Sequence, residues 1–262
     1  MQFRSVSFLT PEENIFFDEV LFDLAERGLH PDVLRIWESA VPFIVLGKTS
    51  CLSDDVEYLR AMRDHVAVIR RFSAGGAVTQ GRGCLNFTLI FSKDHAPQIA
   101  SVNASYRFIL GKVIDGLRAL GVKAVLYPPC DLAVAGDDRK FSGNAQRRGR
   151  KVILHHGTIL CDHDLSLAQR YLRMPEKAPA YRASRQHADF MMNISRSPKD
   201  VIHCLREVFH AHVEKKGVSR HEQTCLQEII SLKKKDIYRE YNDRNEVDSK
   251  SDADIIRYKQ EG

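Results

Sequence analysis

The feature that most constrains this chain is a basic, glycine-rich loop set between two apolar runs. Residues 70–86 read Arg-Arg-Phe-Ser-Ala-Gly-Gly-Ala-Val-Thr-Gln-Gly-Arg-Gly-Cys-Leu-Asn, and the runs at 66–69 and 87–91 have the composition of β-strands. Glycines let the backbone approach a ligand closely, and successive N–H groups in such a loop form a concavity that binds anions. The loop therefore predicts an anion site, with an ordinary surface hairpin as the alternative.

Two arginines open this loop. The guanidinium groups of Arg70 and Arg71 have the fork geometry that suits phosphate or carboxylate. Adjacent residues of a strand point to opposite faces, so we expect only one of the two to meet a ligand directly.

The rest of the chain predicts a mixture of helices and strands. Thr10-Pro-Glu-Glu is typical of a helix start, and Gly28 would end that helix. Residues 103–120 carry one apolar stripe at helical spacing. Further helices are predicted at 54–64, 165–171, 199–212 and 222–232, and strands at 33–37, 43–46, 122–126, 131–135, 140–145 and 152–160. Because strands and helices do not alternate regularly, we predict an α+β fold with largely antiparallel sheets.

Composition limits the class of protein. The 262 residues are 44% hydrophobic, enough for a full core, yet no apolar run approaches the length of a membrane span. The N-terminus lacks the apolar region of a signal peptide, so we expect a cytoplasmic protein. The six cysteines form no Cys-x-x-Cys pair, which argues against zinc sites and disulfides. The net charge of +5 could favour an acidic partner, and no nucleic-acid-binding motif is present.

A second group of residues lies about 60 positions beyond the loop. Lys140 is followed by small and polar residues that would let a ligand lie along the strand, where the ammonium is a point charge for a carboxylate or phosphate oxygen. The alternative is an exposed hairpin lysine. On the next strand, His155 and His156 must face opposite ways, so only one can enter a shared site.

Taken together, these motifs resemble the lipoate–protein ligase A family, which is grouped with biotin ligases and octanoyltransferases. The resemblance rests on the arginine–glycine loop, Asn86-Phe87, Asp131-Leu132, the Arg139-Lys-Phe-Ser-Gly-Asn-Ala segment and His155-His-Gly-Thr, in that order. It runs from about residue 3 to 215. It implies a mixed, largely antiparallel large sheet with a smaller sheet and flanking helices, formed by residues 1–216. Residues 217–262 are then a charged helical or disordered extension.

The resemblance also implies a reaction. Family ligases form acyl-AMP from ATP, with Mg²⁺, and lipoate or octanoate, then pass the acyl group to a lysine of a lipoyl domain or H-protein. Lys140 would be the catalytic residue that meets the carboxylate and α-phosphate, and no protein side chain would bind a metal. The remaining residues implied in substrate or nucleotide binding are Arg70, Arg71, Ser73, Gly75, Gly76, Ala77, Val78, Thr79, Asn86, Asp131, Ala145, His156 and Thr158.

Departures from the family pattern leave alternatives open. Ala74 replaces a loop glycine, and Thr79-Gln80 replaces a His-Asp pair. The segment after residue 215 is too short for the accessory domain of long ligases, which implies a separate accessory subunit. The main alternative is an ATP-independent octanoyl or lipoyl transferase, with Cys130 as nucleophile. A non-catalytic lipoate- or nucleotide-binding protein is a further alternative, and a biotin ligase is disfavoured because Gly81-Arg-Gly83 matches the biotin ligase loop only in part.

Overall fold

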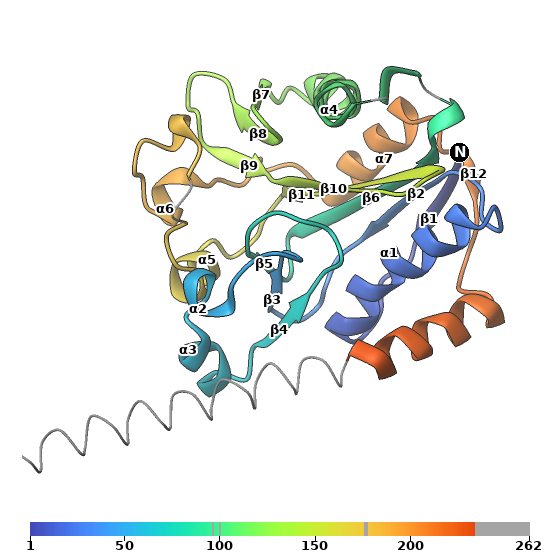
Figure 1. Ribbon diagram of the computed structural model, residues 1–262. Helices are drawn as coiled ribbons and strands as arrows, with labels where there is room; N and C mark the ends of the chain where they lie inside the picture. Colours follow the sequence, from blue (N-terminus) through green and yellow to red (C-terminus); the bar gives the residue numbers. More distant parts are fainter. Residues whose placement is uncertain (96, 100, 176–177, 234–262) are drawn as a thin grey trace, which may run out of the picture.

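The computed structural model describes residues 1–95, 97–99, 101–175 and 178–233 (Figure 1). Its centre is a six-stranded mixed sheet. In spatial order its strands are β10 (Asn144–Arg148), β11 (Val152–Leu160), β6 (Cys84–Ser92), β2 (Val33–Trp37), β1 (Gln2–Ser5) and β12 (Val213–Glu214). Neighbours are antiparallel from β10 to β2, and β1 runs parallel to both β2 and β12.

Two three-stranded sheets complete the strand framework. One has the order β4 (Ala67–Arg70), β3 (Phe43–Leu46), β5 (Val78–Gln80), and the other the order β7 (Ala124–Tyr127), β8 (Asp131–Val134), β9 (Lys140–Ser142). The predicted α+β fold, with a largely antiparallel large sheet and smaller sheet structure beside it, is confirmed.

The prediction of one continuous strand over 140–145 is wrong. The chain leaves one sheet and enters another at Gly143, because β9 pairs with β8 whereas β10 pairs with β11. Lys140 therefore belongs to a small sheet, and Ala145 to the large one.

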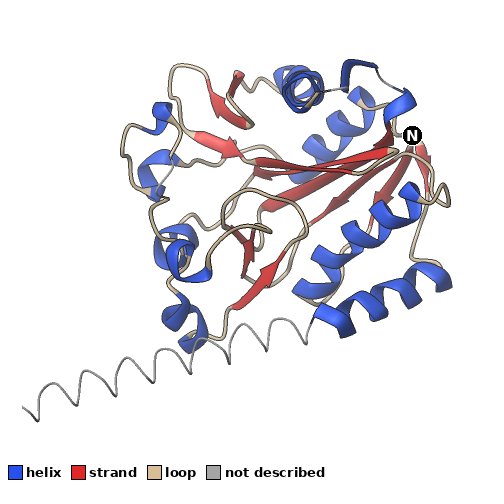
Figure 2. Cartoon of the chain, viewed as in Figure 1, coloured by secondary structure: helices blue, strands red, loops and turns tan. Residues whose placement is uncertain are grey.

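Helices cover both faces of the large sheet (Figures 1 and 2). On one face lies α1 (Pro11–Glu26), whose start is a capping box: Thr10 Oγ1 accepts from the Glu13 N–H and the Glu13 carboxylate accepts from the Thr10 N–H. The other face is covered by α4 (Val102–Ala119) and α7 (Pro198–Val208). The shorter helices are α2 (Leu52–Asp55), α3 (Tyr58–Arg63), α5 (Ser166–Tyr171) and α6 (His187–Phe190), with 3₁₀ turns at Lys93–His95, Pro97–Ile99 and Ala180–Arg182.

A further helix, residues 220–233, lies beside α1 (Figure 1). Leu226 and Ile230 are buried in the same apolar cluster as the inner side of α1. Glu222 is also buried and forms an ion pair with Arg4 of β1. The rest of the predicted extension, residues 234–262, lies outside the described residues.

Two findings bear on the class of protein. None of the helices in the described ranges has the length and hydropathy needed to cross a bilayer. No disulfide links any of the six cysteines, all of which lie in the described part of the chain.

Candidate active site

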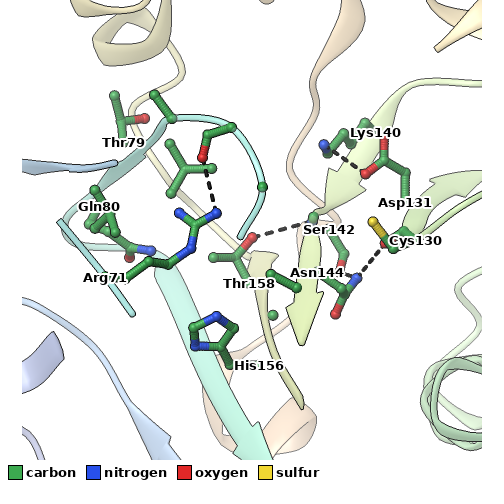
Figure 3. Close-up of a pocket in the computed structure, with 18 of the residues that line it drawn as sticks. Arg71, Thr79, Gln80, Cys130, Asp131, Lys140, Ser142, Asn144, His156 and Thr158 are labelled. Atoms are coloured by element: carbon green, nitrogen blue, oxygen red, sulfur yellow. Dashed lines mark hydrogen bonds and ion pairs between the residues drawn. The ribbon is translucent and has the colours of Figure 1, made fainter. Parts of the chain in front are cut away.

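A cavity of about 320 Å³ lies where the glycine-rich loop, the large sheet and β9 meet (Figure 3). One wall is formed by loop residues 75–80, another by β11, and a third by the start of β9 with the turn before β8. Most of the residues implied by the sequence resemblance line it: Arg71, Gly75, Gly76, Ala77, Val78, Thr79, Asn86, Cys130, Asp131, Lys140, Ala145, His156 and Thr158. Arg70 and Ser73 do not line the cavity.

The two loop arginines face opposite ways, as strand alternation predicts. Arg70 turns away and donates from Nη1 to the carbonyl oxygens of Gly47 and Ser50, at 2.9 and 2.7 Å. Arg71 turns inward, where its Nη2 donates to the carbonyl oxygens of Ala74 and Gly76 at 2.8 and 3.1 Å. Arg71 thus holds the loop that surrounds it.

The charge of Arg71 is the main electrostatic feature of this wall. Burial lowers the pKa of Arg71 to about 10, because a low-dielectric environment disfavours the cation. The other groups that act on this pKa are Tyr106 and Cys130, whose own pKa values are raised by burial, so both are neutral at pH 7. An anion in the cavity would neutralise this buried positive charge.

The glycine loop is pressed against the turn that follows β3. A Cβ at Gly47 would lie 1.7 Å from the carbonyl oxygen of Gly75, and Gly75 itself has φ +101°. The Lys48 N–H donates to the carbonyl of Ser73 at 2.8 Å. Glycine is therefore required at both points of this contact, one for space and one for backbone conformation.

On the opposite wall, Lys140 is fixed by an acidic neighbour (Figure 3). Its Nζ lies 2.8 Å from Asp131 Oδ1, and the side chain is 26% exposed. The second oxygen of Asp131 accepts from the Tyr181 hydroxyl at 2.9 Å. A Cβ at Gly143 would lie 3.1 Å from both Cε and Nζ of Lys140, so the lysine passes directly over this glycine.

Cys130 precedes Asp131 and also lines the cavity. Burial raises the pKa of the Cys130 thiol, and the Asp131 charge adds to the effect, outweighing the nearby ammonium of Lys140. The thiol is therefore protonated at neutral pH in this state. The backbone carbonyl of Cys130 accepts a hydrogen bond from Asn144 Nδ2 at 2.8 Å.

The adjacent histidines of β11 lie on opposite faces of the large sheet. His156 lines the cavity on the α1 side. His155 packs against Phe87 and Tyr106 on the α4 side, where burial lowers its pKa to about 3. Only one of the two histidines therefore reaches the cavity.

Several residues that the sequence reasoning missed contribute to the cavity. Asp18 of α1 lines it although it lies on the buried face of the helix, and a carboxylate on an apolar helix face was the available signal. The buried indole N–H of Trp37 also belongs to this lining and has no acceptor among the described residues. Gln80 was missed as well, and its side-chain amide exchanges two hydrogen bonds, of 2.9 and 2.8 Å, with that of the predicted residue Asn86.

Metal ligands are not gathered at this site. Within the ranges that the structure describes, no group of three or more His, Cys, Asp or Glu side chains could hold a metal ion. The cavity instead presents a buried guanidinium and a backbone loop on one side, and an ammonium on the other. This arrangement is suited to a ligand with separated negative groups.

Sequence comparison identifies relatives. The family model described as the lipoyl protein ligase A/B catalytic domain matches residues 10–215. A probable lipoate-protein ligase A of Mycoplasma pneumoniae is 30% identical over 164 residues, which is 63% of this chain and 46% of that protein. The match thus spans about half the length of that relative. The octanoyltransferase LipM of Geobacillus kaustophilus is 26% identical over 207 residues, 70% of this chain and 73% of LipM.

Solved structures share the fold. A bi-partite lipoate protein ligase, studied with its E2 lipoyl domain from Thermoplasma acidophilum, has a TM-score of 0.74 at 18% identity, covering 88% of this chain and 91% of the other. A lipoate-protein ligase A bound with ATP has a TM-score of 0.72 at 20% identity, covering 88% of this chain and 94% of the other.

Proposed function

Because this chain belongs to the lipoyl protein ligase A/B catalytic domain family, we propose that it attaches lipoate or octanoate to a lysine of a lipoyl-domain protein or H-protein, through an acyl-AMP made from ATP. Membership of a family of lipoate ligases and octanoyltransferases indicates an enzyme.

The observation that carries this proposal is the pairing of two cationic walls across one cavity. The buried guanidinium of Arg71 stands with the glycine loop on one wall, and Lys140 stands on the other (Figure 3). Backbone N–H groups and a guanidinium suit the phosphates of ATP. An ammonium suits the point where a carboxylate meets the α-phosphate.

The chemistry of activation requires such an arrangement. A carboxylate oxygen forms a bond to the α-phosphorus, the bond to the bridging oxygen breaks, and pyrophosphate leaves with its electron pair. The two reactants are both anions, so fixed positive charge offsets their repulsion and stabilises the transition state. We assign this role to Lys140, with Mg²⁺ supplied as the ATP complex.

The second half-reaction transfers the acyl group. The amine of an acceptor lysine attacks the acyl carbonyl, AMP leaves, and the nitrogen releases a proton. Lys140 must not compete as an acceptor. As an ammonium held by Asp131, it has no lone pair with which to attack the carbonyl.

A transferase mechanism is the second candidate, because Cys130 lines the cavity beside the Lys140–Asp131 pair and an octanoyltransferase is among the relatives. In that reaction the thiolate would take the acyl group from a carrier as a thioester. The raised pKa of Cys130 favours the ligase, since nucleophilic attack requires the thiolate. A binding protein without catalysis is the third candidate.

One experiment separates these candidates. The protein is incubated with an apo lipoyl domain and either free lipoate or octanoate with Mg-ATP, or an octanoylated carrier without ATP, and the acceptor is weighed by mass spectrometry. We expect acylation only with ATP, unchanged by Cys130→Ser or by the control Cys225→Ser on the helix beside α1. Acylation only from the carrier, lost in Cys130→Ser, would establish the transferase, and ligand binding without acylation would establish the binding protein.

The acceptor and any further subunit are part of the same proposal. The archaeal structural relative is bi-partite and was studied with an E2 lipoyl domain. We therefore propose a lipoyl domain as the acceptor and a separate accessory subunit as a partner of this chain. If the activation assay fails with this chain alone, it is repeated with the candidate subunit added.

A further inference from the structure

A chain of buried polar contacts connects α1 to the glycine loop. His156 Nε2 lies 2.7 Å from Ser73 Oγ, and Arg71 Nε donates to the same oxygen at 3.0 Å. On the other side of the ring, His156 Nδ1 lies 3.6 Å from Asp18 Oδ2. The order of contacts is Asp18, His156, Ser73, Arg71 and then the loop carbonyls of Ala74 and Gly76.

The first member of this chain is firmly held. Asp18 Oδ1 accepts from Arg35 Nη1 at 2.6 Å, and Oδ2 accepts from the Thr88 hydroxyl at 2.7 Å. Burial acts to raise the pKa of Asp18, but the charge of Arg35, the neighbouring His156 ring and the hydrogen bond from Thr88 outweigh it and hold the pKa below its ordinary value. Asp18 is therefore a carboxylate, which only accepts hydrogen bonds.

The direction of the contacts follows from Asp18. A carboxylate carries no proton, so it favours the ring proton of His156 on Nδ1, which faces it at 3.6 Å. A neutral ring then has Nε2 unprotonated and able to accept from the Ser73 hydroxyl, while the Ser73 oxygen accepts from Arg71 Nε. Burial lowers the pKa of His156, in agreement with a neutral ring at pH 7.

The order Asp–His–Ser is that of a hydrolytic triad, but the geometry does not support a nucleophile. Ser73 is completely buried and does not line the cavity. Its oxygen is already shared between a guanidinium and an imidazole. This series of contacts can orient the side chains that it joins, but a substrate carbonyl cannot reach the hydroxyl of Ser73.

We propose that Asp18 and His156 are positioning residues that act through Ser73 to hold Arg71 and the glycine loop in the arrangement that receives a nucleotide phosphate. The inference rests on the proposed function for the identity of that ligand. All of these contacts are made between residues of the protein itself, so their effect on the loop can be measured separately.

The first measurement is amide hydrogen exchange of the loop, followed by mass spectrometry of peptides covering 73–80 in the ligand-free protein. We expect Ser73→Ala and His156→Phe each to accelerate this exchange by ~10-fold, the equivalent of one lost hydrogen bond. The double variant should be no faster than the faster single variant, because both substitutions break the same chain. His156→Gln, which keeps a side-chain amide able to accept from Ser73, should lie near wild type.

His155→Gln is the matched control. His155 is the neighbouring histidine on the same strand, fully buried where the His156 side chain is 18% exposed, and its ring contacts Gln146 and Asn144, outside the loop. The His155→Gln variant should leave amide exchange at 73–80 unchanged. It thereby tests whether the loss of any buried imidazole in β11 is enough to accelerate exchange of the loop. Equal acceleration in His155→Gln, no acceleration in Ser73→Ala and His156→Phe, or multiplied effects in the double variant would each overturn the proposal.

The second measurement is binding by calorimetry with Mg-ATP as the probe. Ser73→Ala should weaken ATP binding ~10-fold, again the worth of one hydrogen bond, while lipoate affinity stays within twofold. Equal loss of affinity for both ligands would point to general damage and contradict the positioning role. If wild type does not bind ATP, the proposed function fails, and loop exchange alone decides whether the contact chain orders the loop.

Discussion

Lys140, to which we assign the activation step of the proposed reaction, is held within tight steric limits. The side chain crosses Gly143 at 3.1 Å from where a Cβ would lie, and Asp131 holds its ammonium at 2.8 Å. Two neighbours therefore set the position of the Lys140 side chain: Gly143 sterically, and Asp131 through its charge. Each can be tested by a single substitution.

Lys140→Ala should lower acyl-AMP formation by ~10²-fold or more, because a fixed cation at a developing charge commonly contributes this much. Lys140 is not a core residue, so the unfolding midpoint should stay within ~2 °C. Pyrophosphate release measures the first quantity and thermal denaturation the second. Lys199→Ala, which removes an exposed lysine at the start of α7, is the charge-matched control. Near-normal turnover of Lys140→Ala would remove Lys140 from the mechanism.

Gly143→Ala should reduce turnover by ~10-fold while preserving the fold, since a displaced catalytic group loses rate steeply with distance. The added methyl forces the flexible end of Lys140 to move by a few tenths of an ångström. The matched control is Gly111→Ala in α4, where a Cβ meets no atom within 4 Å. This substitution should stabilise the helix by ~0.5–1 kcal/mol, because alanine loses less conformational freedom on folding than glycine. Steady-state kinetics of both variants, with unfolding curves, separate the two effects, and wild-type turnover of Gly143→Ala would contradict the steric role.

For single residues, the predictions made from the sequence were correct where a rule of local geometry applied. Alternation along a strand predicted that one of Arg70 and Arg71, and one of His155 and His156, would reach the cavity. Sequence reasoning missed Asp18: its place on the apolar face of α1 was a signal, but its partner His156 is set only by the packing of α1 on the large sheet. Nor could it place Ser73, whose burial depends on contacts with residues from distant parts of the chain.

At the scale of elements, the helix of residues 220–233 is tied to the large sheet by a buried ion pair. Glu222 receives hydrogen bonds from Arg4 of β1, and the two side chains are 3% and 0% exposed. Burial acts to raise the pKa of Glu222, but the neighbouring His30 and the hydrogen bonds from Arg4 outweigh it and hold the pKa far below its ordinary value. This pair therefore stabilises the fold only while Glu222 is ionised.

Glu222→Gln should lower the free energy of unfolding by ~3 kcal/mol at pH 7, because it leaves the buried Arg4 without its counter-ion. The difference should shrink as the pH falls below ~4.3, the unfolded pKa of a glutamate, because the unfolded state of wild type then takes up a proton that the folded state resists. Urea titrations at pH 7 and pH 4 measure both values. Asp115→Asn, in an exposed pair with Arg118, should cost less than ~1 kcal/mol at either pH. A pH-independent difference for Glu222→Gln would contradict this account.

Most elements could be predicted from the sequence because their signals are local. The capping box of α1 and the apolar stripe of α4 are examples. The break at Gly143 could not, since 140–145 reads as one strand and only its pairing partners, β8 and β11, divide it. Strand partners are set by contacts distant in sequence, which local patterns do not encode.

For the whole molecule, net charge bears on how the proposed acceptor protein would be met. The chain carries 39 lysines and arginines against 34 aspartates and glutamates, hence +5. A surface of one net sign accelerates encounter with an oppositely charged partner, and salt screens this effect. The acceptor, unlike the small acid, is a protein with its own surface charge.

Transfer to an acidic lipoyl domain should therefore slow with salt, with kcat/KM for the acceptor falling ~10-fold between ~0.05 and ~0.5 M NaCl. Acyl-AMP formation without acceptor should fall less, since the fixed contacts of the cavity are buried. Acceptor acylation and pyrophosphate release are followed in parallel across the salt series. A lipoyl domain with its surface carboxylates replaced is the control, and it should lose the salt dependence. Equal salt dependence of both steps would argue against electrostatic encounter with the acceptor.

The parallel pairing of β1 with β12 has a consequence for how the molecule is made. β1 begins at Gln2, and its outer neighbour comes from Val213 and Glu214, with the Lys215 N–H donating to the Phe3 carbonyl at 3.0 Å. A ribosome delivers β1 more than 200 residues before its partner β12. Until then the growing chain presents β1 as an open edge, the kind of surface on which nascent chains pair with one another. Completion of this edge of the sheet therefore waits until residues 213–215 have been made.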